Sequence, residues 1–300
     1  AASKQLSFTA SGTIAQGKPV ILNANGTVTQ VAGVAESLGS EAVFSSGVFT
    51  NSSSCYDSTN DKIGIVYSDG GNSDYGTAVV GTVSGTTLSF GTPVVFETAE
   101  TINTSAAFDS SNGKVVIAYR DADNSNYGTA IVGTVSGTSI SFGTAVVFES
   151  ATTQYTSSTF DSNSNKIVIA YRDTGNSSYG TAIVGTVSGT SISFGTPVVF
   201  ESAATVPNVT FDSSNNKVVI AYQDGGNSNY GTAIVGTVSG TGISFGSAAV
   251  FESAGIGAEL QVVFDSTANK VVVAYIDTGN SSHGTAAVGT VSGTSISFGT

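Results

Sequence analysis

Residues Phe160–Ser202 read FDSNSNKIVIAYRDTGNSSYGTAIVGTVSGTSISFGTPVVFES, and this stretch recurs with few changes from Tyr56 to the C-terminus. An aspartate follows the first residue of every copy, and these aspartates are separated by 52, 52, 51 and 53 residues. Self-similarity at such a period predicts a stacked or radial repeat architecture. The copies begin near Tyr56, Phe108, Phe160, Phe211 and Phe264.

Each copy predicts four short antiparallel strands, called A to D. In the third copy, strand A spans residues 157–162, strand B 166–173, strand C 179–187 and strand D 191–202. Clusters of Asn, Ser, Gly and Thr between them are typical of turns. Strand B is an almost continuous apolar run, as expected of a strand buried on both faces. Four strands in about fifty residues match one blade of a β-propeller.

The fold prediction is an all-β, five-bladed β-propeller over residues 39–300. Its ends are complementary in sequence, since SEAVFSSGVFT at 40–50 resembles the PVVFES that closes each repeat, whereas the last copy stops at SISFGT, 295–300. We therefore expect N- and C-terminal strand segments to close the ring and remove exposed strand edges. The alternative is an open array or a fibrous β-solenoid, whose coils usually take about 20 to 30 residues.

Residues 1–38 do not match the repeat and predict a small β-hairpin anchor module. LSFTASG at 6–12 alternates like a strand, and residues 18–31 form a predicted hairpin around Asn25 and Gly26. Asn-Gly between alternating apolar residues is a strong hairpin signal because both turn residues accept positive φ. A hairpin and one strand bury little core alone, so we expect this module to pack on the repeat body, on a neighbouring copy or on a larger assembly.

Composition excludes several classes of partner. Charged residues make up only 10% of the chain, against about 25% in a typical soluble protein. The net charge of -12 disfavours nucleic acid and anionic membranes, which would repel the chain. No run of eighteen apolar residues predicts a membrane helix, and Ala1 does not begin a signal peptide. The only cysteine, Cys55, aligns with small or apolar residues in other copies and is expected to be a packing residue.

One face of the predicted blades is the candidate binding face. The D-to-A connections differ among otherwise similar copies, and loops on a rigid scaffold are where binding residues concentrate. Neutral drift in exposed loops is the alternative explanation. Tyr155 and Glu259 lie in two of these connections, which read TAETINT (98–104), SATTQYT (150–156), SAATVPN (202–208) and SAGIGAELQ (253–261).

The same face collects carboxylates and two arginines. An aspartate ends every strand B, and five such groups could bind a cation or sugar hydroxyls; the favoured alternative is that each caps its own turn as in Asx-turns. Arg120 and Arg172 precede two of them and could contact a ligand carboxylate, although pairing with the adjacent aspartate is the simpler account. These aspartates are Asp69, Asp121, Asp173, Asp224 and Asp277.

The sequence predicts no catalytic residue, metal site or cofactor. His283, the only histidine, occupies a position where the other copies carry tyrosine, and no nucleophile unique to that copy accompanies it. No His/Cys cluster indicates a transition metal and no phosphate loop is present. An acid pair for glycoside hydrolysis would require one copy to differ sharply from the rest.

Two resemblances accompany these patterns. The sequence DTGNSSY at 173–179 is similar to the Asp-box hairpin of sialidase-type propellers, but that family's arginine triad and nucleophilic tyrosine have no counterpart in this chain, so its activity is not implied. The repeat together with SFTASGTIAQGKPVILNANGTV at 7–28 resembles repetitive β-proteins of bacteriophage virions, such as tail fibres, spikes or capsid decorations. This likeness implies a structural, adhesive surface protein anchored by its N-terminal module.

The leading functional prediction is a non-enzymatic virion surface protein that displays a propeller for host-surface or glycan binding. It expects other virion proteins as partners through residues 1–38, an oligomeric or particle-bound state, and no nucleic acid or membrane insertion. The alternative is a multivalent lectin or secreted adhesin, extracellular, with one sugar site per blade. An Asp-box glycosidase is the third hypothesis.

Overall fold

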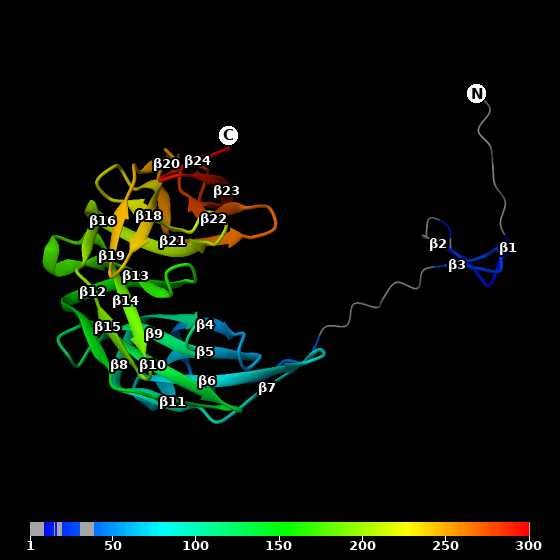
Figure 1. Ribbon diagram of the computed structural model, residues 1–300, viewed down its shortest axis with the longest axis horizontal. Coiled ribbons are helices and arrows are strands. Elements are labelled where there is room, and N and C mark those ends of the chain that lie inside the picture. Colours follow the sequence, from blue (N-terminus) through cyan, green and yellow to red (C-terminus); the bar gives the residue numbers. More distant parts are fainter. Residues whose placement is uncertain (1–8, 15, 17–19, 31–38, 300) are drawn as a thin grey trace. The chain divides into compact units, whose positions relative to one another are not determined.

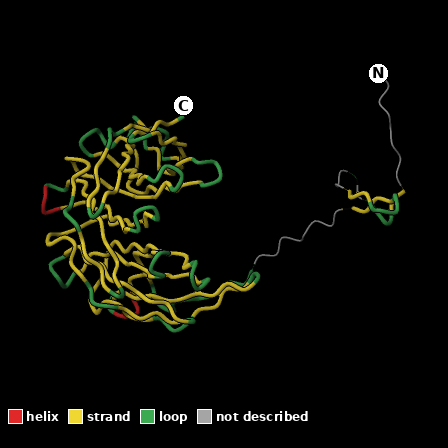
Figure 2. The backbone as a smooth tube through the Cα atoms, viewed as in Figure 1, coloured by secondary structure: helices red, strands yellow, loops and turns green. Residues whose placement is uncertain are grey.

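The computed structural model describes residues 9–14, 16, 20–30 and 39–299 (Figure 1). The chain divides into two compact units, Ala1–Ser40 and Glu41–Thr300. Figure 2 shows strand through most of the second unit, with helix confined to two three-residue turns, η1 (Gly70–Asn72) and η2 (Thr174–Asn176). None of the described helices is long and apolar enough to cross a membrane. The predicted all-β class is confirmed.

The first unit contains a three-stranded sheet in the order β1-β3-β2. Its strands are β1 (Thr9–Ala10), β2 (Val20–Leu22) and β3 (Thr27–Gln30). β2 and β3 form the predicted hairpin, and β1 pairs parallel to β3. The turn is wider than a two-residue loop, because Asn23 donates its N–H to the Thr27 carbonyl and only Gly26 has positive φ, at 80°.

In the second unit every repeat copy folds into antiparallel strands, and the copies are called blades one to five. Blade one begins with β4 (Phe49–Asp57), β5 (Lys62–Asp69), β6 (Tyr75–Ser84) and β7 (Thr87–Phe90). Blade two begins with β8 (Val94–Asp109), β9 (Lys114–Asp121), β10 (Tyr127–Ser136) and β11 (Ser139–Phe142). Blade three begins with β12 (Val146–Asp161), β13 (Lys166–Asp173), β14 (Tyr179–Ser188) and β15 (Ser191–Phe194).

Blades four and five repeat the pattern. Blade four comprises β16 (Val198–Asp212), β17 (Lys217–Asp224), β18 (Tyr230–Ser239), β19 (Gly242–Phe245) and β20 (Ala249–Glu252). Blade five comprises β21 (Ile256–Asp265), β22 (Lys270–Asp277), β23 (His283–Ser292) and β24 (Ser295–Phe298). The observed strand B of blade three has the predicted bounds, and strand C extends one residue further.

The outer strand and the D-to-A connections differ from the prediction. Strand D is broken in two: β7 pairs with the end of β6, and the start of β8 pairs with the beginning of β6. β8, β12 and β16 then continue without a turn into strand A of the following blade. The expected variable loops at 98–104, 150–156 and 202–208 are therefore extended strand. Each passes from the outer edge of one blade to the inner strand of the next.

A β-bulge in strand A explains the unequal repeat periods. In blade three the register passes from Gln154↔Arg172 to Ser157↔Ala170, so two residues face one, and blades one and two have the same shift. Blade four pairs without interruption, and blade five has a longer shift between Ile256 and Leu260. One inserted residue gives the 52-residue period, none gives 51 and two give 53.

Apolar side chains pack each blade against the next. Four buried clusters join blades one and two, two and three, three and four, and four and five. In the first, Phe96 of the outer strand packs against Tyr119 and Phe142 of the following blade, with ring centroids 5.3 and 5.7 Å apart. The strand B residues Val116, Val168 and Val219 are fully buried, as their apolar runs predict.

Figure 1 shows the blades following an arc whose two ends are blade one (blue to cyan) and blade five (orange to red). None of the four clusters joins those two blades among residues 39–299. Within the described part of the chain β23 pairs with β24 only through Gly289–Ser292, so the first half of β23 has no outer partner strand there. The expected ring closure is therefore not formed in this structure, although the repeated blades agree with a propeller-type architecture.

Candidate functional site

The five aspartates that end strand B are turn caps. Each side chain is largely buried or half-buried and accepts a backbone N–H within its own B-to-C turn, as the Asx-turn interpretation predicts. The donors lie two or three residues further on, and the oxygen-to-nitrogen distances are 2.9–3.1 Å. The structure does not gather these carboxylates into one ring, since each serves a separate blade. They are Asp69, Asp121, Asp173, Asp224 and Asp277.

The glutamates of the outer strands also have structural partners. Tyr119 of blade two donates its hydroxyl to Glu97 of blade one at 2.9 Å, and the three following junctions carry the same bond at 3.1–3.2 Å. Burial and then the neighbouring glutamate raise the pKa of each tyrosine, to about 12 for Tyr275 and further for the other three. These tyrosines stay protonated at neutral pH, and their hydroxyl groups hydrogen-bond adjacent blades to each other.

The junction of blades three and four brings two predicted site residues together. The Arg172 guanidinium lies over the Tyr155 ring, with its central carbon 4.7 Å from the ring centroid. Arg172 also donates its Nε hydrogen to the Thr205 carbonyl of blade four at 2.7 Å and an Nη1 hydrogen to Gln154 Oε1 at 3.4 Å. The arginine is thus held by three groups from β12 and β16, rather than by the adjacent Asp173 as the simpler account expected.

Tyr155 owes its position to the strand A bulge. Its φ is 53°, in the left-handed region that bulky residues rarely adopt. Asn51 and Asn103 occupy the same position in blades one and two with φ of 49° and 54°, and asparagine tolerates this conformation better. A bulge re-aims the side chain that it carries. A half-buried tyrosine kept in a strained conformation is an indication of a binding role.

The other blades vary the residue that corresponds to Arg172. Arg120 holds this position in blade two, and its Nε is buried without a hydrogen-bond partner in the described structure. Gln223 in blade four donates to the Ile256 carbonyl of blade five at 2.5 Å, as Arg172 does to its own neighbour. Ser68 bonds within its own turn, to the Asp74 carbonyl, and Ile276 is apolar. The junctions are therefore chemically unequal.

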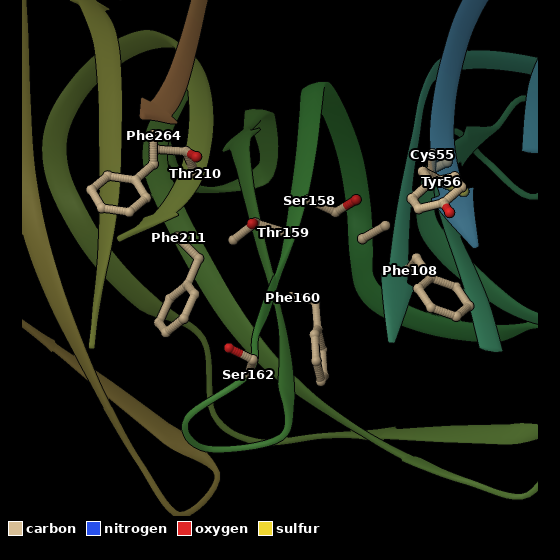
Figure 3. Close-up of a pocket in the computed structure, with 12 residues that line it drawn as sticks. Cys55, Tyr56, Phe108, Ser158, Thr159, Phe160, Ser162, Thr210, Phe211 and Phe264 are labelled. Carbon is tan, nitrogen blue, oxygen red and sulfur yellow. The ribbon is translucent and has the colours of Figure 1, made fainter. Parts of the chain in front are cut away.

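The inner strands A line two pockets. The larger, about 450 Å³, carries one aromatic residue from each blade, which Figure 3 labels as Tyr56, Phe108, Phe160, Phe211 and Phe264. Cys55 also lines it, but burial raises the pKa of that thiol to about 12, so it stays protonated and is a poor nucleophile. The second pocket, about 390 Å³, is lined by hydroxyl and amide side chains. Neither lining includes a charged side chain.

A ladder of side-chain hydrogen bonds in the second pocket was not predicted from sequence. Ser53, Ser105 and Ser157 each accept a backbone N–H from the next blade, at 2.9–3.1 Å, and Asn208 does the same for blade five. Three of the repeat copies carry serine at this position, which could have indicated the ladder. The many other serines of the chain make that pattern hard to recognise. Glu259 and His283 are exposed and lie apart from the Tyr155 pair, in blade five.

Comparison with known proteins indicates fold rather than identity. No protein-family model and no curated protein sequence matches the chain. One similar solved structure, described as the SapL1 lectin in complex with alpha methyl fucoside, has 13% identity and a TM-score of 0.49, covering 86% of this chain and 80% of its own. AofleA from Arthrobotrys oligospora has 9% identity and a TM-score of 0.53, covering 82% and 68%.

Neither of these two structures is described as a virion protein, so the predicted likeness to bacteriophage surface proteins receives no support from them, nor do they support Asp-box blades. At identities this low a likeness shows the fold alone. The chain shares with AofleA an all-β fold of repeated antiparallel units, consistent with a propeller.

Proposed function

We propose that this chain is a non-enzymatic, lectin-like protein that binds carbohydrate at a blade junction. The observation that carries the proposal is the Tyr155–Arg172 pair between blades three and four. Sugars present apolar C–H faces and polar hydroxyls, and an aromatic ring beside hydrogen-bond donors suits both. At this junction the ring, the guanidinium of Arg172 and the amide of Gln154 come together within one contact network.

The geometry explains why this junction is favoured over the two pockets lined by the inner strands A. A guanidinium has five N–H donors, and Arg172 directs one to Thr205 and one to Gln154, which leaves the remainder for a ligand. The larger of the two pockets offers hydroxyls but neither a guanidinium nor an amide side chain. The second pocket offers hydroxyls and amides but neither a guanidinium nor an aromatic ring. Pre-organised donors lose less conformational entropy on binding than mobile ones, so a fixed arginine favours affinity.

The junction of blades two and three is the second candidate site. Arg120 replaces Arg172 there and carries the same set of N–H donors, of which the buried Nε has no hydrogen-bond partner in the described structure. Asn103 stands where Tyr155 stands, so this junction lacks the aromatic face. We therefore expect one stronger and at most one weaker site per chain, in place of the five equivalent sites of a simple multivalent lectin.

The test is glycan screening followed by calorimetric titration of the best ligand. The substitution Tyr155→Asn installs the residue that blades one and two carry at the same bulge, so it removes the ring while suiting the backbone. We expect the affinity to fall at least about tenfold, because an aromatic contact and its arginine partner are lost together. Asn103→Ala is the matched control and should leave the stronger site unchanged. Unaltered affinity in Tyr155→Asn would exclude this site.

Three finer predictions belong to the same proposal. A closed ring of five blades is proposed on the five repeat copies and on Phe44, which packs on Tyr67 and Phe90 as Phe96 packs on Tyr119 and Phe142 of the following blade. Anchoring to a virion through residues 1–38, and a virion-surface or extracellular location, stay predictions; much of that segment lies outside the described residues. Host-surface glycan as the partner follows from the site chemistry and is tested by the same screen.

A further inference from the structure

The larger pocket of the inner strands A collects one aromatic residue from each blade. Tyr56 and four phenylalanines occupy the same position of the repeat, directly before the aspartate whose side chain accepts N–H groups of the A-to-B turn. Figure 3 labels all five in the lining of this pocket of about 450 Å³. The phenylalanines are Phe108, Phe160, Phe211 and Phe264. We call these five residues the aromatic collar.

The four collar phenylalanines differ from every other phenylalanine that the structure describes. Each of the others packs on a second aromatic ring. Within the described residues the collar phenylalanines have no such ring contact, and Tyr56 has none either. Phe108, Phe160 and Phe211 belong to blades two to four, which have a neighbour on both sides. Their lack of a ring partner is therefore a property of the pocket and does not come from the ends of the chain.

The collar rings are anchored on one side and accessible on the other. Phe108, Phe160 and Phe211 are half-buried against the apolar clusters between blades, and Tyr56 is 54% exposed. An accessible aromatic surface favours contact with an apolar ligand, because that contact removes both surfaces from water. Since packing already fixes the rings, little conformational entropy is lost when a ligand contacts them.

The surroundings of the collar favour a ligand without charge. No charged side chain lines the pocket. Beyond the collar, the aspartate that follows each aromatic residue faces, in the strand ladder, the lysine that begins strand B, as Asp57 faces Lys62. Positive and negative groups thus lie next to each other in every blade. An ion entering the pocket would lose hydration without meeting a partner of opposite charge in the lining.

Three hydroxyl groups give the pocket a limited polar capacity. Thr159, Ser162 and Thr210 line it, and their side chains make no hydrogen bond within the described part of the chain. A hydroxyl can both donate and accept, so these groups suit one polar substituent on an otherwise apolar ligand.

We propose that the aromatic collar binds an uncharged, apolar small molecule, an aromatic compound with at most one small polar substituent. Its rings pack against the collar in offset or edge-to-face contacts, and the hydroxyls orient the substituent. The volume of about 450 Å³ lies within the range of about 300–1,000 Å³ that is usual for small-molecule sites. This site is separate from the proposed sugar site, whose guanidinium and amide serve a polar ligand, and does not depend on it.

The first test titrates the full-length protein with N-phenyl-1-naphthylamine, a neutral dye whose emission rises in apolar surroundings. We expect saturable binding of one dye per chain. The double variant Phe160→Leu with Phe211→Leu keeps apolar bulk but removes two collar rings, so its affinity for the dye should fall at least about fivefold. Absence of saturable binding to the unaltered protein would overturn the proposal.

The matched control is Phe194→Leu with Phe245→Leu. These phenylalanines are also half-buried and belong to the same two repeat copies, but their rings pack on Phe148 and Phe200 outside the pocket. The affinity of this control for the dye should stay within about twofold of the unaltered protein, because all collar rings remain. Equal losses in the two double variants would overturn the collar as the site.

Two measurements on the unaltered protein do not depend on how the variants fold. Benzyl alcohol should displace the dye at a concentration at least about fivefold lower than benzoate or benzyltrimethylammonium, since either ion must give up hydration. Stronger displacement by either ion would overturn the uncharged class of ligand.

The second of these measurements locates the dye. Cys55 lines the same pocket, so bound dye should slow alkylation of its thiol by N-ethylmaleimide at least about threefold at constant pH. An unchanged rate at saturating dye would show that the dye binds elsewhere and would overturn the proposal.

Discussion

Single serine hydroxyls form hydrogen bonds between the innermost strands of neighbouring blades, and Ser157 makes one that is buried. Its Oγ accepts the Val209 N–H at 3.1 Å in a buried setting. Ser157→Ala leaves that N–H without a partner, which costs about 1–3 kcal/mol of unfolding free energy. Chemical denaturation of the two proteins measures the difference.

The matched control for that substitution is Ser111→Ala. Ser111 also bonds to the next blade, through Asn165 at 2.5 Å, but on the exposed side where water can replace the lost hydroxyl. We expect a change below about 0.5 kcal/mol, as for ordinary surface substitutions. Equal losses in both variants would show that burial of the ladder adds nothing to its strength.

At the scale of one element, the strand A bulge sets the spacing of the repeat and presents Tyr155. Deleting Tyr155 should convert β12 to the uninterrupted register of β16, because blade four pairs normally with one residue fewer. We expect a folded protein that has lost less than about 2 kcal/mol, since the strained tyrosine is removed with the bulge. Hydrogen exchange of strands A and B of blade three reports the new pairing.

Deleting Ile169 from the uninterrupted strand β13 is the contrasting change. It shifts half of that strand by one residue and turns buried side chains toward the wrong face, so we expect blade three to unfold. If both deletions were equally harmful, the bulge would be an integral part of the blade rather than an insertion.

The same elements show what the sequence predicts and what it does not. The limits of β13 follow from an apolar run between Lys166 and Asp173, and the turn role of Asp173 follows from its local sequence. The sequence identifies Tyr155 as a variable position among the repeat copies. It does not predict where the Tyr155 side chain lies, because the outer strand continues into the next blade through pairings between residues distant in sequence. From sequence alone, Arg172 is expected to pair with the adjacent Asp173. In the structure its Nε donates a hydrogen bond to the carbonyl of Thr205, 33 residues away.

At the scale of the whole molecule, tyrosine–glutamate bonds at four successive junctions make the assembly sensitive to alkali. The four tyrosines have pKa values raised above the ordinary 10, to about 12 for Tyr275, first by burial and then by the glutamate that accepts the hydroxyl. A raised folded pKa means that the unfolded chain loses its protons first as pH increases. The stability that these bonds provide is therefore complete below about pH 10 and is lost progressively as pH rises toward 12 and beyond.

Melting temperatures measured from pH 7 to pH 12 should accordingly fall above pH 10, because the unfolded chain then releases protons that the junction tyrosines retain in the folded state. Tyr275→Phe removes one such group, so its melting curve should start lower at pH 7, where Glu252 has lost a hydrogen bond, and decline less between pH 10 and 12. Tyr56→Phe is the control, because the Tyr56 hydroxyl is exposed and bonds to Asp61 within its own blade rather than across a junction. Identical alkaline slopes in all three proteins would mean that the junction tyrosines do not govern the pH limit of the fold.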